Sequence, residues 1–278
     1  MRLNRFLASA GLGSRRSVEE IIKSGRVKIN GRPVTDLATQ VGPEDSVKVG
    51  TKVVHVEQTL TAVLYKPRGY LCTADDELER RTIFELLPEG WPRVFHVGRL
   101  DKESEGLLIV TNDGDLSLSL THPSHQIEKE YEVGIDKPFD SEHREKLLKG
   151  IRIEGGLAKA EYVNVVTPQL LKLTLRQGIK RQIRLMCYTL GYEVTHLRRI
   201  RVGPLRIGAM RPGEWRILND KEIAALKASK PVPRPPRPPR PASAAPAPPK
   251  SRAIKRTRPT AEMRRQEHRS PKPSPESI

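Results

Sequence analysis

Proline spacing near the end of the chain limits what can fold there more strongly than any other feature of the sequence. Fourteen of the 24 prolines lie in residues 230–278, and residues 231–249 combine proline with arginine, alanine and serine. Proline lacks a backbone N–H and fixes φ, so neither a helix interior nor a central strand tolerates this density. We therefore expect residues 230–278 to form a disordered or extended basic tail.

The distribution of charge follows the same division. The 278 residues carry a net charge of +17, and the 49 residues from Lys230 onward supply 13 basic and three acidic side chains. A strongly basic chain favours a polyanionic partner such as RNA. The tail charge could hold RNA phosphates through counterion release, or it could only keep the chain soluble. No apolar run reaches the 18–20 residues of a membrane span, so we expect a cytoplasmic protein with no membrane contact.

Few residues are available for metal or disulfide chemistry. The chain has two cysteines, Cys72 and Cys187, and seven scattered histidines. This composition is not that of a disulfide-stapled domain, and it offers no ligand spacing of a zinc site. No glycine-rich phosphate loop is present either. We expect neither a metal nor a nucleotide cofactor.

Residues 1–60 have the pattern of a small independent unit. Apolar residues recur at helical spacing from Leu3 to Ala10, and Ser14 is a candidate N-cap for a second helix that ends before Gly25. Residues 27–29 alternate as a short strand, and the Asn30-Gly31 pair that follows is a strong tight-turn signal.

Basic side chains are concentrated in this unit. Residues 1–32 contain eight basic and two acidic residues. A run of like charge is often only a solvated face, but its concentration on one helix and hairpin favours RNA binding. The candidate RNA-binding residues are Arg2, Arg5, Arg15, Arg16, Lys23, Arg26, Lys28, Asn30 and Arg32.

Residues 61–229 read as a larger α+β unit with a mainly antiparallel sheet. Strand patterns cover residues 61–65, 93–100 and 107–110, and apolar residues alternate with polar ones over 131–135 and 171–175. Helical patterns lie near residues 116–121, 141–149, 179–190 and 219–229.

Asp101 stands at the end of one of these strands. In extended geometry Arg99 projects to the same side, and an arginine beside an aspartate favours the ionised carboxylate. Such a carboxylate can act as a nucleophile or a base, although a turn aspartate in a surface ion pair fits the same pattern. A glycosidase using Asp101 and Glu105 would need an aromatic-lined sugar groove, and 12 aromatics in 278 residues argue against one.

A second candidate site lies at the start of the helix predicted for residues 179–190. Ile183 and Met186 lie on its apolar stripe, whereas Lys180, Arg181 and Arg184 share the opposite face. Three cations on one stripe repel each other, so an anion is expected to bind there, unless the stripe is only solvated.

Two resemblances narrow these alternatives. Residues 3–7, 13–16 and 25–32 resemble the RNA-binding module named after ribosomal protein S4, over about residues 2–50. Residues 95–116, with the Lys-Pro-Arg-Gly-Tyr segment at 66–70, resemble the bacterial ribosomal RNA pseudouridine synthases of the RsuA group. The second resemblance spans about residues 2–218, and it implies two helices on a small sheet followed by a pseudouridine synthase domain at 61–229.

The resemblance also implies residue roles. Asp101 matches the nucleophile of the family, Tyr131 the ring that stacks on the flipped uracil, and Arg184 the ion-pair partner of the aspartate. Leu197 matches the leucine that packs in the pocket, and we expect Arg99 to contact RNA or to fill the empty pocket. Leu185 departs from the pattern, since many relatives carry arginine there.

The substrate is less constrained than the reaction. Residues 191–194 and the basic tail look more like the large-subunit enzymes of the group, so we expect 23S ribosomal RNA, with 16S ribosomal RNA as the alternative. We expect a monomer that acts on free RNA or on a pre-ribosomal particle. A non-catalytic ribosome-assembly factor is the rival function, but it would have no need of the Asp101, Tyr131 and Arg184 set.

Overall fold

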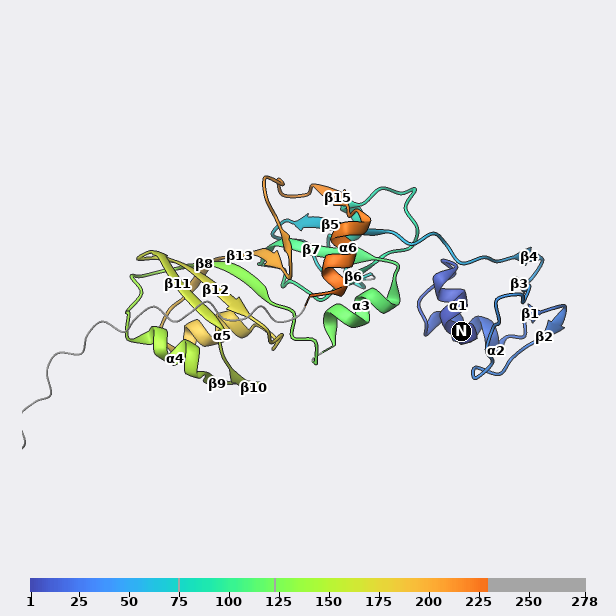
Figure 1. Ribbon diagram of the computed structural model, residues 1–278, viewed down its shortest axis with the longest axis horizontal. Helices are drawn as coiled ribbons and strands as arrows, with labels where there is room; N and C mark the ends of the chain where they lie inside the picture. The colour runs from blue at the N-terminus through green and yellow to red at the C-terminus, as the bar shows by residue number, and fades with distance from the viewer. Residues whose placement is uncertain (75, 123, 230–278) are drawn as a thin grey trace, which may run out of the picture. The chain divides into compact units, whose positions relative to one another are not determined.

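The computed structural model describes residues 1–229 apart from positions 75 and 123 (Figure 1). The expected tail at residues 230–278 therefore lies outside the described residues. No helix of the described part is long and apolar enough to cross a membrane. The helices are α1 (Leu3–Ser9), α2 (Ser17–Lys23), α3 (Gly114–Thr121), α4 (His143–Lys149), α5 (Gln182–Thr189) and α6 (Asp220–Lys227), with a 3-10 turn at Ile83–Leu86.

The N-terminal part packs two helices on a four-stranded sheet in the order β2-β1-β3-β4. Its core includes Leu3, Leu7, Val18 and Ile22, which are fully buried. The strands are β1 (Val27–Ile29), β2 (Arg32–Pro33), β3 (Val47–Val49) and β4 (Lys52–Val53).

Two local expectations for this part have different outcomes. Asn30 and Gly31 both have positive φ, at 50° and 83°, so the tight turn is confirmed. Ser14 is not the N-cap of the second helix, which begins three residues later at Ser17. The Ser14 hydroxyl accepts the Ser17 N–H at 3.1 Å and so stabilises the turn that precedes the helix.

The larger part is built on a nine-stranded sheet, and the prediction of a mainly antiparallel sheet is confirmed. Its main path runs β11-β12-β8-β13-β7-β5-β15, with β14 beside β13 and β6 beside β7. Every pairing is antiparallel except β13 with β7, which is parallel over two residue pairs. The strands are β5 (Thr61–Lys66), β6 (Phe95–Val97), β7 (Glu105–Thr111), β8 (Lys129–Ile135), β11 (Tyr162–Thr167), β12 (Leu170–Leu175), β13 (Val194–Val202), β14 (Leu205–Arg206) and β15 (Trp215–Ile217), and β9 (Ile151–Ile153) pairs with β10 (Gly156–Ala158) separately.

Alternation along β5 and β7 separates two hydrophobic cores. Val63 and Tyr65 belong to a core that includes residues of α3 and α6. Leu64, one residue out of phase, belongs to a core with Leu100 and the segment before β6. Successive strand residues point to opposite faces, so these cores lie on opposite sides of this half of the sheet.

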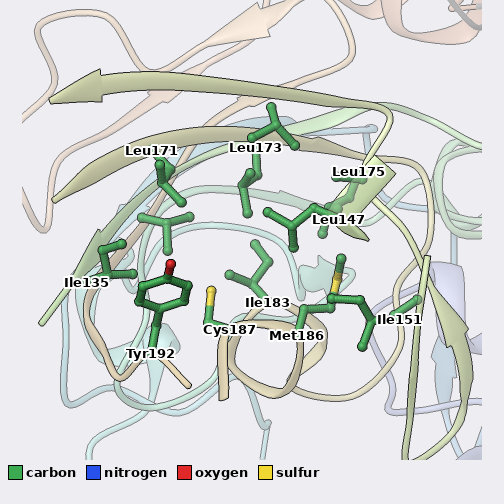
Figure 2. Close-up of a cluster of buried hydrophobic side chains, with 14 of the residues drawn as sticks. Ile135, Leu147, Ile151, Leu171, Leu173, Leu175, Ile183, Met186, Cys187 and Tyr192 are labelled. Carbon is green, nitrogen blue, oxygen red and sulfur yellow. The ribbon is translucent and has the colours of Figure 1, made fainter. Parts of the chain in front are cut away.

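A third core covers the other half of the sheet. Leu171, Leu173 and Leu175 of β12 pack there with Ile183 and Met186 of α5 (Figure 2). The apolar stripe predicted for this helix is therefore confirmed. The helix begins at Gln182 instead of residue 179, because Arg181 adopts a left-handed backbone with φ 54°. The predicted strand at 93–100 is also too long, since β6 ends at Val97 and Gly98 turns the chain with φ 72°.

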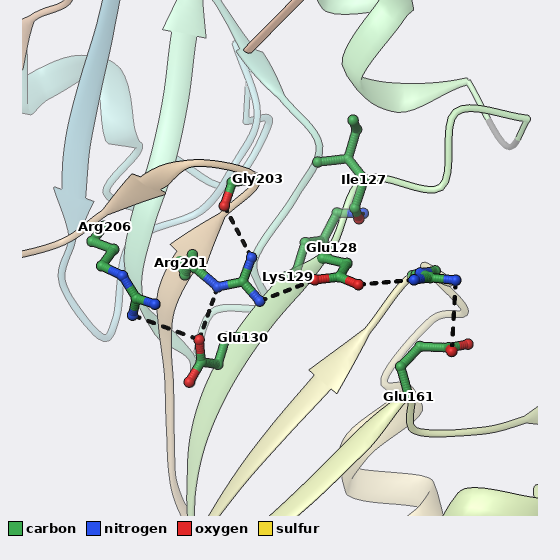
Figure 3. A network of polar contacts seen from close by, with 9 residues as sticks. Ile127, Glu128, Lys129, Glu130, Glu161, Arg201, Gly203 and Arg206 are labelled. Atoms are coloured by element: carbon green, nitrogen blue, oxygen red, sulfur yellow. Dashed lines mark hydrogen bonds and ion pairs between the residues drawn. The ribbon is translucent and has the colours of Figure 1, made fainter. Parts of the chain in front are cut away.

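Arginine–glutamate pairs join neighbouring strands of this half. Arg201 of β13 donates to Glu130 at 2.8 Å and to Glu128 at 3.2 Å (Figure 3). Arg176 pairs with the other oxygen of Glu128 at 2.9 Å and with Glu161 at 3.7 Å. The network holds β13, β8 and the end of β12 together beside the buried core.

Candidate active site

The turn between β6 and β7 carries Asp101. Leu100 points into the core, at 7% exposure, while Asp101 is half-buried and Arg99 is exposed. The Ser104 N–H donates to the Asp101 carbonyl at 3.0 Å and closes the turn. The structure thus holds Asp101 in the connection between β6 and β7, on a turn anchored by a buried leucine.

Lys66 is buried beneath this turn. It ends β5 on the face of the sheet that Leu64 shares, and its side chain is fully inaccessible. Its ammonium donates to the carbonyls of Ser104 at 2.7 Å, Pro67 at 2.9 Å and Lys102 at 3.5 Å. Charge-assisted bonds of this kind are stronger than neutral ones, so Lys66 fixes the backbone that follows Asp101.

Burial and neighbouring charges set the protonation of Lys66. The pKa of Lys66 is lowered to about 8. Burial is the main cause and Arg199 adds to it, while Cys72, Asp101 and Glu103 partly offset the shift. No ion pair within 4.0 Å joins Lys66 to any described residue. Asp101 and Glu103 are therefore the acidic residues whose negative charge favours the protonated amine of Lys66.

Arg184 approaches the same turn from α5. It donates to the carbonyls of Val194 at 3.2 Å and Glu103 at 3.3 Å. Burial lowers the pKa of Arg184, as does Arg181, while Asp101 raises it. The guanidinium is thus in the field of Asp101, but no ion pair within 4.0 Å joins the two within the described part of the chain.

Tyr131 and Leu197 lie on neighbouring strands of the same sheet. Tyr131 of β8 pairs with Arg199 of β13, and Leu197 pairs with Val133. Tyr131 is half-buried and packs against two cores, the one under α5 and the one that contains Leu100. Since Leu100 precedes Asp101, the ring lies on the face of the sheet that carries the Asp101 turn.

Glu105 lies on the opposite face. Its carboxylate accepts the Tyr65 hydroxyl at 3.0 Å, and Tyr65 belongs to the core that faces away from Leu100. Asp101 and Glu105 therefore do not oppose each other across one groove. The glycosidase alternative loses its second carboxylate.

Comparison with known proteins decides the family. Residues 61–189 match the RNA pseudouridylate synthase family, and residues 1–47 match the S4 domain. An uncharacterised RNA pseudouridine synthase of Aquifex aeolicus is 38% identical over 81% of this chain and 93% of its own. The chain belongs to the RNA pseudouridine synthase family.

Further relatives agree with this membership. Ribosomal large subunit pseudouridine synthase B of Bacillus subtilis is 35% identical over 82% of this chain and 96% of its own. The dual-specificity RNA pseudouridine synthase RluF of Escherichia coli is 38% identical over 81% and 78%. A crystal structure of a pseudouridylate synthase matches with a TM-score of 0.60 and 28% identity, over 81% of this chain and 99% of that one. The predicted family, fold class and isomerase activity are confirmed.

The S4-like part of this pseudouridine synthase presents most of its candidate RNA-binding side chains to solvent. Arg5 is half-buried, and Lys23 forms an ion pair with Glu20 at 2.9 Å. Asn30 is also exposed, but its amide donates to Asp45 at 2.8 Å and accepts the Ser46 N–H at 2.9 Å. Asn30 is therefore committed to the fold. Apart from Lys23 and Asn30, the exposed candidates are Arg2, Arg15, Arg16, Arg26, Lys28 and Arg32.

The predicted cationic stripe on α5 is wrong in part. Lys180 and Arg181 are exposed but precede the helix, because of the left-handed backbone at Arg181. Arg184 lies in the helix and is directed toward the Asp101 turn by its bond to the Glu103 carbonyl. The three cations do not form one helical stripe.

Sequence reasoning missed Lys66 and Arg199. Arg199 is 3% exposed, and it donates to the carbonyls of Leu107 at 2.7 Å and Arg99 at 3.3 Å. Periodicity assigns charged residues to solvent, so neither position was a candidate. A usable signal is that both stand in apolar strand patterns at positions where alternation expects a core residue. No group of three His, Cys, Asp or Glu suited to a metal occurs among the described residues.

Proposed function

We propose that this pseudouridine synthase modifies a uridine of ribosomal RNA in the large subunit, with Asp101 as its nucleophile. The family supplies the reaction class, and the large-subunit relative of Bacillus subtilis supports large-subunit ribosomal RNA as the substrate. The observation that carries the role of Asp101 is its turn, whose backbone is bonded on both sides by buried cations.

The reaction needs a carboxylate that is ionised and held still. The target uridine flips out of its RNA helix and binds on the face of the sheet that carries the Asp101 turn. Asp101 attacks and forms a transient covalent bond with the nucleotide, the bond from the sugar to the ring nitrogen breaks, and the uracil rotates. A ring carbon then bonds the sugar as the bond to Asp101 breaks, and that carbon loses its proton while the freed ring nitrogen gains one. The Asp101 turn is held for this step by Lys66, which donates to the Ser104 carbonyl, and by Arg184, which donates to the Glu103 carbonyl.

Tyr131 and Leu197 hold the base while this occurs. An aromatic face is a sequence-tolerant platform for a base removed from its stack, and Tyr131 is half-buried and packs against the core that contains Leu100. Leu197 is buried two residues before Arg199 on β13 and supports the ring from the adjacent strand. Arg99 is exposed at the rim, where it can bind an RNA phosphate.

The exposed arginines and lysine of the S4 part bind structured ribosomal RNA, free or in an assembling particle, and the enzyme works as a cytoplasmic monomer. Contacts to phosphates position a protein on RNA without reading the base sequence. These residues therefore supply affinity for RNA, and the catalytic part selects the uridine. The alternative address is 16S ribosomal RNA.

The test is pseudouridine mapping of 16S and 23S ribosomal RNA from cells that lack this protein. Wild type, Asp101→Asn and Glu89→Gln are returned to the deletion strain. Glu89 is an exposed acid outside the site, so its variant removes the same charge without touching the turn. We expect one 23S site to disappear and to be restored by wild type and Glu89→Gln only. Restoration by Asp101→Asn would remove Asp101 from the mechanism, and a lost 16S site would correct the substrate.

A further inference from the structure

We propose that Arg199 is a positioning residue for the reaction, because its guanidinium fixes the backbone on both sides of the Asp101 turn. This inference rests on the proposed function, since it concerns the step that Asp101 performs. Arg199 acts through the turn and not by contact with the uridine.

The contacts of Arg199 enclose the turn. Its Nη1 donates to the carbonyl of Arg99, two residues before Asp101, and its Nε donates to that of Leu107, in the strand that follows. Lys66 holds the carbonyls of Lys102 and Ser104 between these points. Arg199 therefore joins the chain that enters the turn to the strand that leaves it.

Stability alone does not explain an arginine at this position. The side chain is 3% exposed, and no ion pair within 4.0 Å joins it to a described residue. Its field lowers the pKa of both Lys66 and Lys129, so the cations near it are repelled. A buried charge without an ion pair is costly, and an apolar residue of similar volume commonly serves stability as well. The planar guanidinium instead satisfies two carbonyls that lie in different directions, which a lysine does less well.

The backbone of Arg199 ties the two halves of the site together. On one side Arg199 pairs with Tyr131 of β8, and on the other it pairs with Gly106 of β7. A Cβ at Gly106 would lie 2.3 Å from the Arg199 carbonyl oxygen, so glycine permits this close approach. Arg199 thus sets the Tyr131 strand against the Asp101 turn in one register, and its side chain then locks the turn.

The experiment compares Arg199→Met and Arg199→Lys with Arg201→Met in the full chain. Arg201 is a matched control, because it is also a β13 arginine with little exposure, 13% of its side chain, but it bonds Glu130 and Glu128 away from the turn. A 23S transcript containing the mapped site is used to measure the single-turnover rate, the RNA dissociation constant and the thermal midpoint. All rates are taken well below the lowest midpoint.

We expect both Arg199 variants to lose about 100-fold or more in single-turnover rate, the order of loss that a displacement of about 1 Å produces. Their RNA dissociation constants stay within about twofold of wild type, while Arg201→Met loses stability but keeps its rate within about threefold. If Arg199→Met does not fold, Arg199→Lys, which retains the buried charge, carries the test. A folded Arg199 variant with a wild-type rate would overturn the inference. No product from wild type itself would instead overturn the proposed function.

Discussion

Replacing Gly106 by alanine is expected to be one of the most damaging single-methyl changes in this protein. Gly106 has φ 112°, which L-residues rarely adopt, and strained backbone of this kind costs about 1–3 kcal/mol. The new Cβ would also lie 2.3 Å from the oxygen and 2.7 Å from the nitrogen of Arg199, both backbone atoms in a paired strand. Overpacking of that kind adds about 1–3 kcal/mol. Together these give an expected loss of about 2–6 kcal/mol in the free energy of unfolding.

The matched control is Gly208→Ala. Gly208 has φ 58°, but nothing lies within 4 Å of a Cβ built there, so only the left-handed backbone is penalised, at about 1 kcal/mol. Urea unfolding followed by tryptophan fluorescence suits both variants. The two tryptophans, Trp91 and Trp215, lie outside the S4-like part, so the signal reports on the catalytic part.

The pair of variants separates steric overlap from backbone strain. If Gly106→Ala were no less stable than Gly208→Ala, the close approach of β13 to β7 would not be the reason for glycine. The single-turnover rate adds a second criterion. A stable Gly106→Ala protein with full activity would contradict the view that the β7–β13 contact sets the Asp101 turn.

Three further outcomes are expected. Burial lowers the pKa of Lys129 to about 8, so between pH 8 and 10.5 the unfolded chain keeps a proton that the folded chain has lost. The free energy of unfolding therefore rises with pH over this range, and Lys129→Met should flatten that rise in urea titrations. Ser104 has a buried hydroxyl without a partner among the described residues, so Ser104→Ala should raise the free energy of unfolding by up to about 1 kcal/mol in the same assay. A fall of more than about 1 kcal/mol in the free energy of unfolding would instead show that this hydroxyl forms a hydrogen bond. Burial raises the pKa of the Cys187 thiol to about 12, so native protein at pH 8 should leave Cys187 unlabelled by iodoacetamide until denaturant is added, and rapid native labelling would contradict its burial.

Much of the fold was predictable because its strands alternate cleanly. The buried run at Leu107–Val110 and the alternation from Tyr131 to Ile135 place β7 and β8 correctly, and the Asn30-Gly31 pair predicts its turn. The hydrophobic periodicity of a strand does not indicate which other strand pairs with it. The parallel contact of β7 with β13 joins residues more than 90 apart, and nothing local in either segment indicates it.

The site divides along similar lines. The residues alone left Asp101 as either a nucleophile or a surface aspartate, and the family resemblance favoured the first reading. Lys66 and Arg199 were missed because a charged residue in a strand pattern is normally assigned to solvent. The buried cations of Lys66 and Arg199 are stabilised by backbone carbonyls that lie far from them in the sequence, so these contacts cannot be predicted from the local pattern.

The pairing of β15 with β5 also sets an order of events during synthesis. β5 begins the catalytic sheet, yet its outer neighbour is β15, so the half-sheet behind Asp101 remains open until Ile217 has left the ribosome. The S4-like core is complete by Val47, 170 residues earlier. At about 5–20 residues per second that interval lasts roughly 10–30 s. For that time a nascent chain can hold RNA before it is able to change it.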